Sequence, residues 1–311
     1  MKPIIEIRSL TKDYEAGFWR KRRTRALDNL SLEVQQGEIF GFLGANGAGK
    51  TTTLKLLMRL IFPTSGTARI LDRDIADVSM HQRIGYLPEN PYFYDYLTAR
   101  ELLDYCGQIF GFTKAERSKR TEQLLARVRL EPNKWEVQLR KFSKGMLQRV
   151  GLAQALINEP QVVFLDEPMS GLDPIGRREV RDLISSLRLD GKTVFMCSHI
   201  LSDIEVLCDR VAILKRGRLA HIGYLDQIRQ RAGNHNYVEI VATGTEASTL
   251  EQNIGVDGGC KVTATAGGLK VEVADEKSVD AVIAALRKSG GQLVSVQPLR
   301  QSLEELFLEE N

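Results

Sequence analysis

The chain has little cysteine, little net charge and no long apolar run, and each shortage excludes a class of protein. A run of about eighteen apolar residues, which a membrane-spanning helix needs, occurs nowhere in the 311 residues. With 43 Lys and Arg against 40 Asp and Glu, the formal charge of +3 is too small to hold nucleic acid by overall attraction. No C-x-x-C motif joins the four cysteines, so neither a zinc site nor a disulfide framework is predicted, and a reducing compartment is indicated.

The rest of the composition is that of an ordinary globular protein. Hydrophobic residues make up 43% of the chain and charged residues 27%, which is enough to bury a sizeable core. The length exceeds what one hydrophobic core usually supports, so two domains are expected. The first residues, 1–7, place Glu6 inside an apolar stretch and predict a first strand rather than a signal peptide.

Apolar runs rich in β-branched residues alternate with helical patterns as far as about residue 230. Residues 38–43, 161–165 and 193–197 are such runs, and each is followed by a Gly-rich turn or a helical pattern. This alternation predicts an α/β fold with a mixed or parallel sheet flanked by helices. Between Leu97 and Asn158 the strand patterns stop and apolar residues recur at helical spacing, which predicts an inserted helical subdomain at about 90–158.

A polar stretch at 231–236 marks the expected boundary between a first domain at 1–233 and a second at 234–311. The second domain has strand patterns at 237–242, 261–265, 270–273 and 292–296, with a hairpin signal at Gly267-Gly268. Helices are expected in a short segment after the first strand, at 278–288 and at 302–309. This order predicts a small α+β domain of the split βαβ kind.

Residues 44–51 match the phosphate-loop pattern G-x-x-x-x-G-K-[ST] in full. A predicted strand precedes the loop and a predicted helix at 52–57 follows it, so a chance Gly-rich turn is the weaker interpretation. The glycines allow backbone N–H groups to converge on phosphate oxygens, and the helix N-terminus favours negative charge. Lys50 is expected to reach the β- and γ-phosphates and Thr51 to bind Mg²⁺. The predicted nucleotide-binding residues here are Gly44, Ala45, Asn46, Gly47, Ala48, Gly49, Lys50, Thr51 and Thr52.

A second apolar run, 162–165, ends in the carboxylates Asp166 and Glu167. Asp166 is a candidate second support for Mg²⁺. Side chains alternate along a strand, so Glu167 is expected to point away from Asp166 and to polarise a water in line with the γ-phosphate. By itself this motif also fits a strand that ends in charged residues at the surface, and the phosphate loop is what makes the functional interpretation the stronger one.

Residues 142–149, F-S-K-G-M-L-Q-R, resemble the L-S-G-G-Q signature of ATP-binding cassette (ABC) ATPases. Residues 170–174 are similar to the D-loop of that family, and 84–89 lie at its Q-loop position. His199 resembles its switch histidine, and Tyr14 lies where the family has an aromatic residue that stacks on adenine. The resemblance covers roughly residues 3–230, with six motifs in the family's order, and the tail ending at 302–308 is similar to that of bacterial ABC-2-type exporter ATPases.

The resemblance implies the fold of a P-loop NTPase cassette and a composite site for ATP and Mg²⁺. Two cassettes pair head to tail in this family, as a homodimer or with a second ABC ATPase. Ser143 and Gly145 would then bind the γ-phosphate across an interface that also contains Lys144 and Asp173. The implied catalytic residues are Glu167, His199 and Lys50, and the implied Mg²⁺ residues are Thr51, Asp166 and Glu89. Glu89 replaces the usual Gln, and Lys144 and Met146 depart from the usual signature.

The function implied is that of an ATP-hydrolysing motor subunit of a bacterial ABC-2-type exporter. Such a subunit drives a separate transmembrane permease, which in this family meets the region of Tyr92 to Tyr96, and it lies peripherally on the cytoplasmic face of the inner membrane. No nucleic-acid partner is expected. The alternative is a non-transport ABC ATPase in translation or nucleic-acid maintenance. Translation factors of that type carry two cassettes, however, and chromosome-type members place a long coiled coil in the interval from Thr51 to Ser143, which here is only roughly 90 residues. A P-loop GTPase or kinase would leave the signature, the D-loop and His199 unexplained.

The basic run from Arg20 to Arg25 has two interpretations. It fits a solvated hairpin between two early strands, or a contact with acidic lipid headgroups or an acidic partner.

Overall fold

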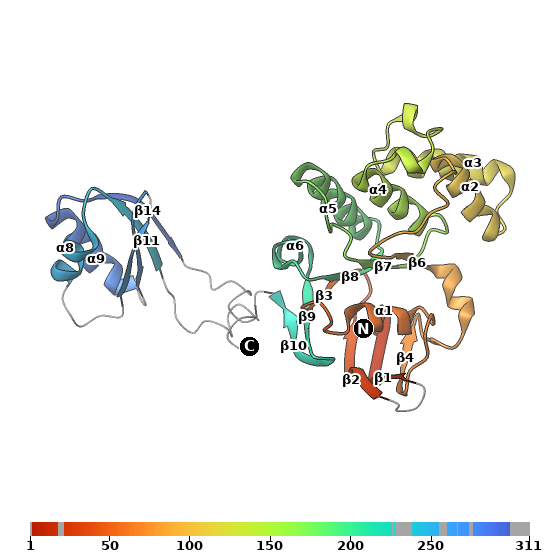
Figure 1. The fold of residues 1–311 in the computed structure, drawn as a ribbon, viewed down its shortest axis with the longest axis horizontal. Coiled ribbons are helices and arrows are strands. Elements are labelled where there is room, and N and C mark those ends of the chain that lie inside the picture. Colours follow the sequence, from red (N-terminus) through yellow and green to blue (C-terminus); the bar gives the residue numbers. More distant parts are fainter. Residues whose placement is uncertain are drawn as a thin grey trace. The chain divides into compact units, whose positions relative to one another are not determined.

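The computed structural model describes residues 2–17, 22–225, 227, 238–254, 260–265, 267–273 and 276–298. The chain divides into two compact units, Met1–Leu225 and Asp226–Asn311 (Figure 1). The sequence pattern predicts a boundary a few residues later, at 233/234. No helix among the described residues has the length and apolar character needed to cross a membrane.

The first unit is built on a six-stranded sheet with the order β10-β9-β3-β8-β7-β6. All neighbouring strands are parallel except β10, which is antiparallel to β9. The central strands are buried over their whole length because helices or a second sheet cover both faces, as parallel sheets require. The strands are β3 (Ile39–Leu43), β6 (Ile84–Leu87), β7 (Val162–Asp166), β8 (Thr193–Ser198), β9 (Arg210–Lys215) and β10 (Arg218–Tyr224).

A second, antiparallel sheet has the order β2-β1-β4-β5. Figure 1 shows this sheet and α1 (Lys50–Leu57) on one side of the six-stranded sheet. One hydrophobic core includes Ile5 and Leu30 of this sheet, Leu54 of α1 and Phe42 and Phe164 of the larger sheet. The strands are β1 (Ile5–Ala16), β2 (Arg22–Val34), β4 (Ser65–Ile70) and β5 (Arg73–Asp74).

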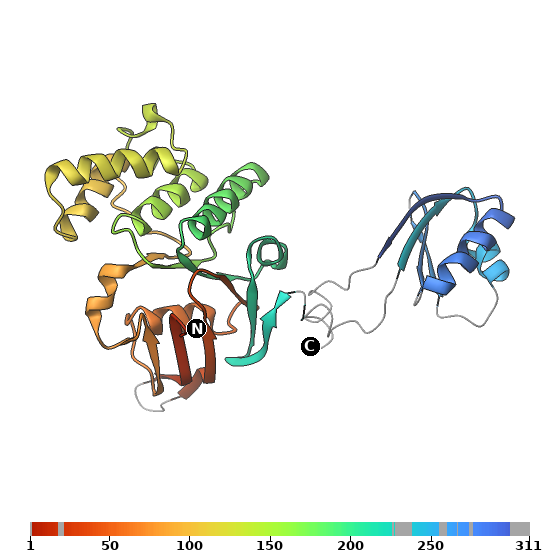
Figure 2. The same cartoon turned by 180° about the vertical axis from the view of Figure 1, so that it is seen from behind.

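Helices lie on the other side of the six-stranded sheet (Figure 2). They are α2 (Ala99–Ile109), α3 (Lys114–Arg127), α4 (Lys144–Ala155), α5 (Pro174–Leu189) and the short α6 (Leu201–Leu207). Short 3₁₀ helices lie at Val78–Arg83, Pro132–Lys134 and Leu139–Lys141. Capping boxes start α2 at Thr98 and α3 at Thr113, since each Thr is followed three residues later by a Glu that bonds back to it. All of α2, α3 and α4 lie within the stretch that the sequence predicts to be helical.

The second unit has the chain order β11-α8-β12-β13-α9-β14 and an antiparallel sheet ordered β12-β13-β11-β14. Both helices lie on one face of the sheet (Figure 2) and bury Ile240, Leu250 and Val282 in a core of their own. This arrangement is the predicted split βαβ architecture. Its elements are β11 (Val238–Thr243), α8 (Ala247–Ile254), β12 (Cys260–Thr265), β13 (Gly268–Val273), α9 (Glu276–Lys288) and β14 (Gln292–Pro298). The helix predicted at 302–309 lies outside the described residues.

Candidate nucleotide-binding site

The phosphate loop connects β3 to α1, as the sequence pattern requires. Gly49 has a φ of 110° and immediately precedes the helix, and Gly47 has a φ of 82°. A Cβ on Gly49 would lie 2.6 Å from the carbonyl oxygen of Ala26, and one on Gly44 would lie 2.8 Å from that of Leu214. Neighbouring backbone therefore restricts these two positions to glycine, apart from any ligand. Ala45, Asn46 and Gly47 form the exposed tip of the loop, while Ala48 is buried.

Lys50 lies inside the loop with only 6% of its surface exposed. Its Nζ donates to the carbonyl oxygen of Gly44 at 2.6 Å and of Ala45 at 3.4 Å. The same nitrogen lies 3.4 Å from Oε1 of Glu167. These acceptors hold the buried Lys50 ammonium group in a position where it can bind an anion that enters the loop.

Asp166 ends β7 and is 1% exposed. Burial raises the pKa of its carboxyl to about 6; the hydrogen bond from Thr51 lowers it, and the negative charges of Glu167 and Glu89 raise it further. Its Oδ1 is buried and has no hydrogen-bond partner among the described residues. The free carboxylate oxygen of Asp166 and the hydroxyl oxygen of Thr51 are both hard ligands. Together they fit a Mg²⁺ ion whose remaining coordination positions are filled by phosphate and water oxygens. Glu89 is exposed and is close enough to act on Asp166 through its charge.

Glu167 follows directly and is 6% exposed. Its φ is 49°, a left-handed conformation that costs a non-glycine residue on the order of 1 kcal/mol or more. Oε2 lies 2.8 Å from Nδ1 of His199 and accepts from the His199 backbone N–H at 3.3 Å. Because β7 ends at Asp166, the left-handed backbone at Glu167 and not the alternation of the strand sets the direction of its side chain.

The structure therefore brings Lys50, Thr51, Asp166, Glu167 and His199 together. Thr52 is half-buried in the first turn of α1. Tyr14 lies on β1, 40% exposed, with Nζ of Lys12 5.2 Å from the ring centre.

The residues resembling the signature and the D-loop lie at two helix N-termini. Ser143 is the N-cap of α4, where its Oγ accepts from the N–H of Met146 at 3.3 Å. Asp173 is the N-cap of α5 and accepts from the N–H of Gly176 at 2.6 Å. Lys144 extends over Gly171, and Gly145 lies beside Leu172. Within one chain, these two segments contact each other.

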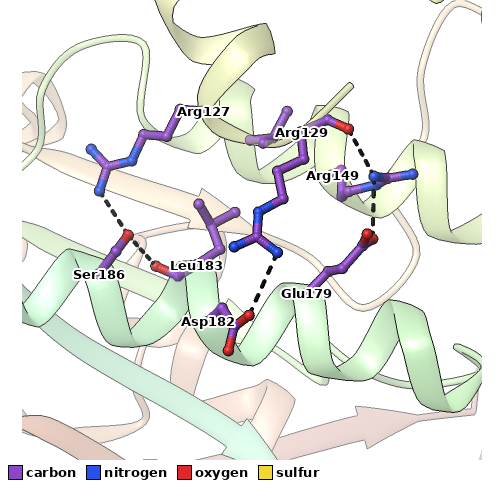
Figure 3. Close-up of a pocket in the computed structure, with 8 residues that line it drawn as sticks. Arg127, Arg129, Arg149, Glu179, Asp182, Leu183 and Ser186 are labelled. Carbon is purple, nitrogen blue, oxygen red and sulfur yellow. Dashed lines mark hydrogen bonds and ion pairs between the residues drawn. The ribbon is translucent and has the colours of Figure 1, made fainter. Parts of the chain in front are cut away.

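A separate cavity of about 330 Å³ lies between the end of α3, α4 and α5 (Figure 3). Figure 3 shows three arginines facing the side of α5. Arg127 donates to Ser186, Arg129 pairs with Asp182 at 3.5 Å, and Arg149 pairs with Glu179 at 3.2 Å. No sequence pattern predicts these contacts, because the partners are about 30 to 60 residues apart along the chain.

Family models match both units of the chain. The model described as ABC transporter matches residues 27–170, and that described as ATP-binding protein DrrA1-3-like, C-terminal domain, matches residues 223–310.

Named relatives span most or all of the chain. An ABC transporter ATP-binding protein of Synechocystis is 44% identical over 315 residues, covering 98% of this chain and 84% of its own length. The bacitracin transport ATP-binding protein of Bacillus licheniformis is 41% identical over 242 residues, covering 77% of this chain and 75% of its own.

Solved structures also match. The ATP-binding cassette MJ0796, in a dimeric post-hydrolysis state bound to ADP and phosphate, is 27% identical with a TM-score of 0.64, over 71% of this chain and 98% of its own. An ATP-binding subunit of an ABC transporter is 32% identical with a TM-score of 0.64, over 74% of this chain and 93% of its own.

Proposed function

The chain belongs to the family of ABC transporter ATP-binding proteins, and we propose that it is the motor subunit of a membrane exporter, dimerising around two ATP molecules and driving a separate transmembrane permease. The predicted fold class, an ABC cassette with a small C-terminal α+β domain, is confirmed, and so is the prediction of an ATPase. Nothing favours the alternative role in translation or nucleic-acid maintenance.

The observation that supports this proposal most directly is the position of the Glu167 carboxylate. It lies beside the phosphate loop, with Lys50 at one oxygen and His199 at the other. In the proposed mechanism Glu167 accepts a proton from the water that attacks the γ-phosphate. Lys50 exchanges its loop carbonyls for β- and γ-phosphate oxygens, and His199 orients the carboxylate and contacts the γ-phosphate.

Mg²⁺ is part of the proposal because the residues present fit it. Thr51 and Asp166 would hold the ion, with Glu89 nearby as an additional acid. When bound, the ion neutralises charge on the phosphate oxygens. The replacement of Gln by Glu at position 89 adds a negative charge near Asp166, which strengthens the attraction for a divalent cation.

The proposed dimer is a homodimer, or a pair with a second ABC ATPase, in which the two ATP sites are shared. Ser143 and Gly145 at the start of α4 would donate to the γ-phosphate of the other cassette, since a helix N-terminus presents unpaired N–H groups and a partial positive charge. Lys144 and Asp173 would lie in the interface, and Tyr14 would stack on adenine. The dimeric MJ0796 structures support a paired arrangement.

The proposed permease contact is the exposed aromatic segment after β6. Tyr92, Tyr94 and Tyr96 are 99%, 56% and 59% exposed, which is unusual for side chains of this size. A subunit bound there would lie on the cytoplasmic face of the membrane as a peripheral protein. The relatives whose names include bacitracin transport support the transport role. We further propose domains at 1–233 and 234–311, with the helical subdomain at about 90–158.

The test is Glu167→Gln in the full chain. This variant is expected to bind ATP as the parent does, to lose hydrolysis by at least about 100-fold, and to accumulate as a dimer with ATP in light scattering. Glu179→Gln, an acid on α5 outside the site, is the control and should hydrolyse ATP like the parent. Turnover at the parental rate by Glu167→Gln would contradict the assigned base.

A further inference from the structure

Asp203 is a buried carboxylate that the site described above does not use. It lies in the first turn of α6, is 3% exposed, and its Oδ2 has no hydrogen-bond partner among the described residues. The nearest cation is Arg177, in the first turn of α5, whose Nη2 is 3.7 Å from that oxygen. Nε of Arg177 is also buried and without a hydrogen bond in the described part of the chain.

Such a pair contributes little to stability, so another reason for it is needed. Asp203 is almost completely buried while the Arg177 side chain is 30% exposed, and the 3.7 Å between them is longer than a hydrogen bond, so the cost of burying the Asp203 charge is only partly offset. Burial raises the pKa of Asp203, while the charges of Arg177 and Arg181 oppose that shift. A pair of apolar side chains would fill the same space at lower cost.

The position of the pair in the chain supplies a reason. Arg177 follows the 170–173 segment, with its backbone N–H bonded to the carbonyl of Asp173, and the Ser170 N–H is bonded to the carbonyl of Glu167. Asp203 follows His199 by four residues, and His199 contacts the Glu167 carboxylate. Two chains of contacts therefore lead away from Glu167, one through the 170–173 segment to Arg177 and the other through His199 to Asp203. The ion pair connects their far ends.

At the start of α6 the backbone N–H of the N-cap residue, Ile200, donates to Oγ of Ser198 at 3.0 Å, whereas the Ile200 side chain caps no N–H group of the helix. On the side of α6 that faces the sheet, Ile204 and Cys208 pack against Gly41 of β3, where a Cβ would lie 2.9 Å from Sγ of Cys208. This packing holds α6 against the sheet, and His199 directly precedes the N-cap residue of that helix.

We propose that Arg177 and Asp203 are positioning residues for hydrolysis: by joining the first turns of α5 and α6, they hold His199 against Glu167 and couple it to the 170–173 segment. This inference rests on the proposed function, because it needs Glu167 to be the base. In this proposal the pair acts by positioning His199, and the charge of Asp203 also acts on His199 and Glu167.

The experiment compares the full chain with Asp203→Asn, Asp203→Glu and the double variant Arg177→Met with Asp203→Leu. Asp203→Asn should lower kcat at least 10-fold while the Kd for ATP stays within 2-fold. Asp203→Glu, which keeps the charge, should recover at least a third of the parental kcat. Asp190→Asn is the control, since Asp190 pairs with Arg127 at the opposite end of α5 and should leave kcat unchanged.

The double variant separates positioning from stability. Its thermal midpoint should equal or exceed that of the parent, because no buried charge is left, while its kcat stays at least 10-fold low and the pH dependence of kcat is altered. A folded double variant with parental kcat and pH profile would overturn the proposal. If Asp203→Glu were as slow as Asp203→Asn, the charge-based account would also be overturned. Glu167→Gln is measured in parallel, because its activity tests whether Glu167 is the base and does not depend on the role of the ion pair. Failure of the proposed function and failure of the positioning proposal can therefore be told apart.

Discussion

Nδ1 of His199 lies 2.8 Å from Oε2 of Glu167, and the backbone N–H of His199 donates to the same oxygen. A carboxylate accepts, so Nδ1 carries the proton, and in the neutral imidazole Nε2 is left as an acceptor. The His199 side chain is 38% exposed. Because Nδ1 is engaged by Glu167, Nε2 is the ring nitrogen left for a second partner.

Replacing His199 with Ala should slow hydrolysis on the order of 100-fold, because one of the two side chains that fix the Glu167 carboxylate is lost. ATP binding should stay within about 3-fold, since Lys50 and the loop are untouched. Steady-state ATPase assays measure the loss of hydrolysis, and equilibrium binding measures whether the affinity for ATP is kept. His81→Ala, whose ring contacts the carbonyl oxygen of Met58, serves as the matched control. Parental turnover in His199→Ala would be inconsistent with this role.

Asp166→Asn should stabilise the nucleotide-free protein at pH 7.5 in the presence of a chelator. Burial raises the pKa of Asp166 in the folded protein from 3.8 to about 6, so above pH 6 the folded protein contains a buried negative charge. This charge lowers the free energy of unfolding by about 3 kcal/mol. The loss disappears as the pH falls from 6 toward 4, because the folded protein then takes up the proton. Denaturant unfolding of both proteins at several pH values gives the difference.

The gain of Asp166→Asn should therefore shrink as pH falls through 6 and vanish near 4. Asp182→Asn, at a half-exposed acid of α5, should change stability by less than about 0.5 kcal/mol. A gain that is constant with pH would mean that burial of charge is not its cause.

Gly85→Ala should destabilise the first unit by about 3 kcal/mol or more. Gly85 lies on β6, and a Cβ there would overlap the carbonyl oxygen of Ala155 at the end of α4, where neither backbone can yield. Gly107→Ala is the matched control, because it lies inside α2 and its Cβ would meet Cγ of the Arg117 side chain at 3.0 Å rather than a backbone atom. That control should cost at least about 1 kcal/mol less than Gly85→Ala, since a side chain can shift where backbone cannot and Ala favours helix over Gly. Equal unfolding midpoints for both variants would refute the packing argument.

Deleting residues 234–311 should leave ATP affinity within about 3-fold of the full chain. The two units have separate hydrophobic cores, with no residue in common, and the phosphate loop lies wholly in the first. Isothermal titration of the truncated protein measures the effect, and circular dichroism shows whether it is folded. A folded truncation that fails to bind ATP would contradict the two-domain proposal.

Sequence reasoning predicted the parts of the site that depend on local patterns. The strand before Gly44, the helix after Gly49 and the buried strand before Asp166 follow from periodicity and glycine placement, and the split βαβ order follows from the alternation of elements. The left-handed backbone at Glu167 could not be predicted, because no residue type demands it and only the packing around it overcomes its cost. The pairing of Arg177 with Asp203 could not be predicted either. Nothing in the sequence indicates that these two residues are in contact, because only the tertiary fold brings the first turns of α5 and α6 together.

Two attachments of the helical subdomain differ in kind. At β6 it is attached by close packing, with Gly85 against the backbone of Ala155 and Gly151 against the side chain of Leu87. At α5 it is attached by long arginine side chains that reach across a cavity to acids and a hydroxyl (Figure 3). Packed backbone resists displacement, whereas solvated ion pairs exchange partners at little cost. A displacement of the helical subdomain therefore costs less on the α5 side, where charged pairs can exchange, than at β6, where it would separate close-packed atoms.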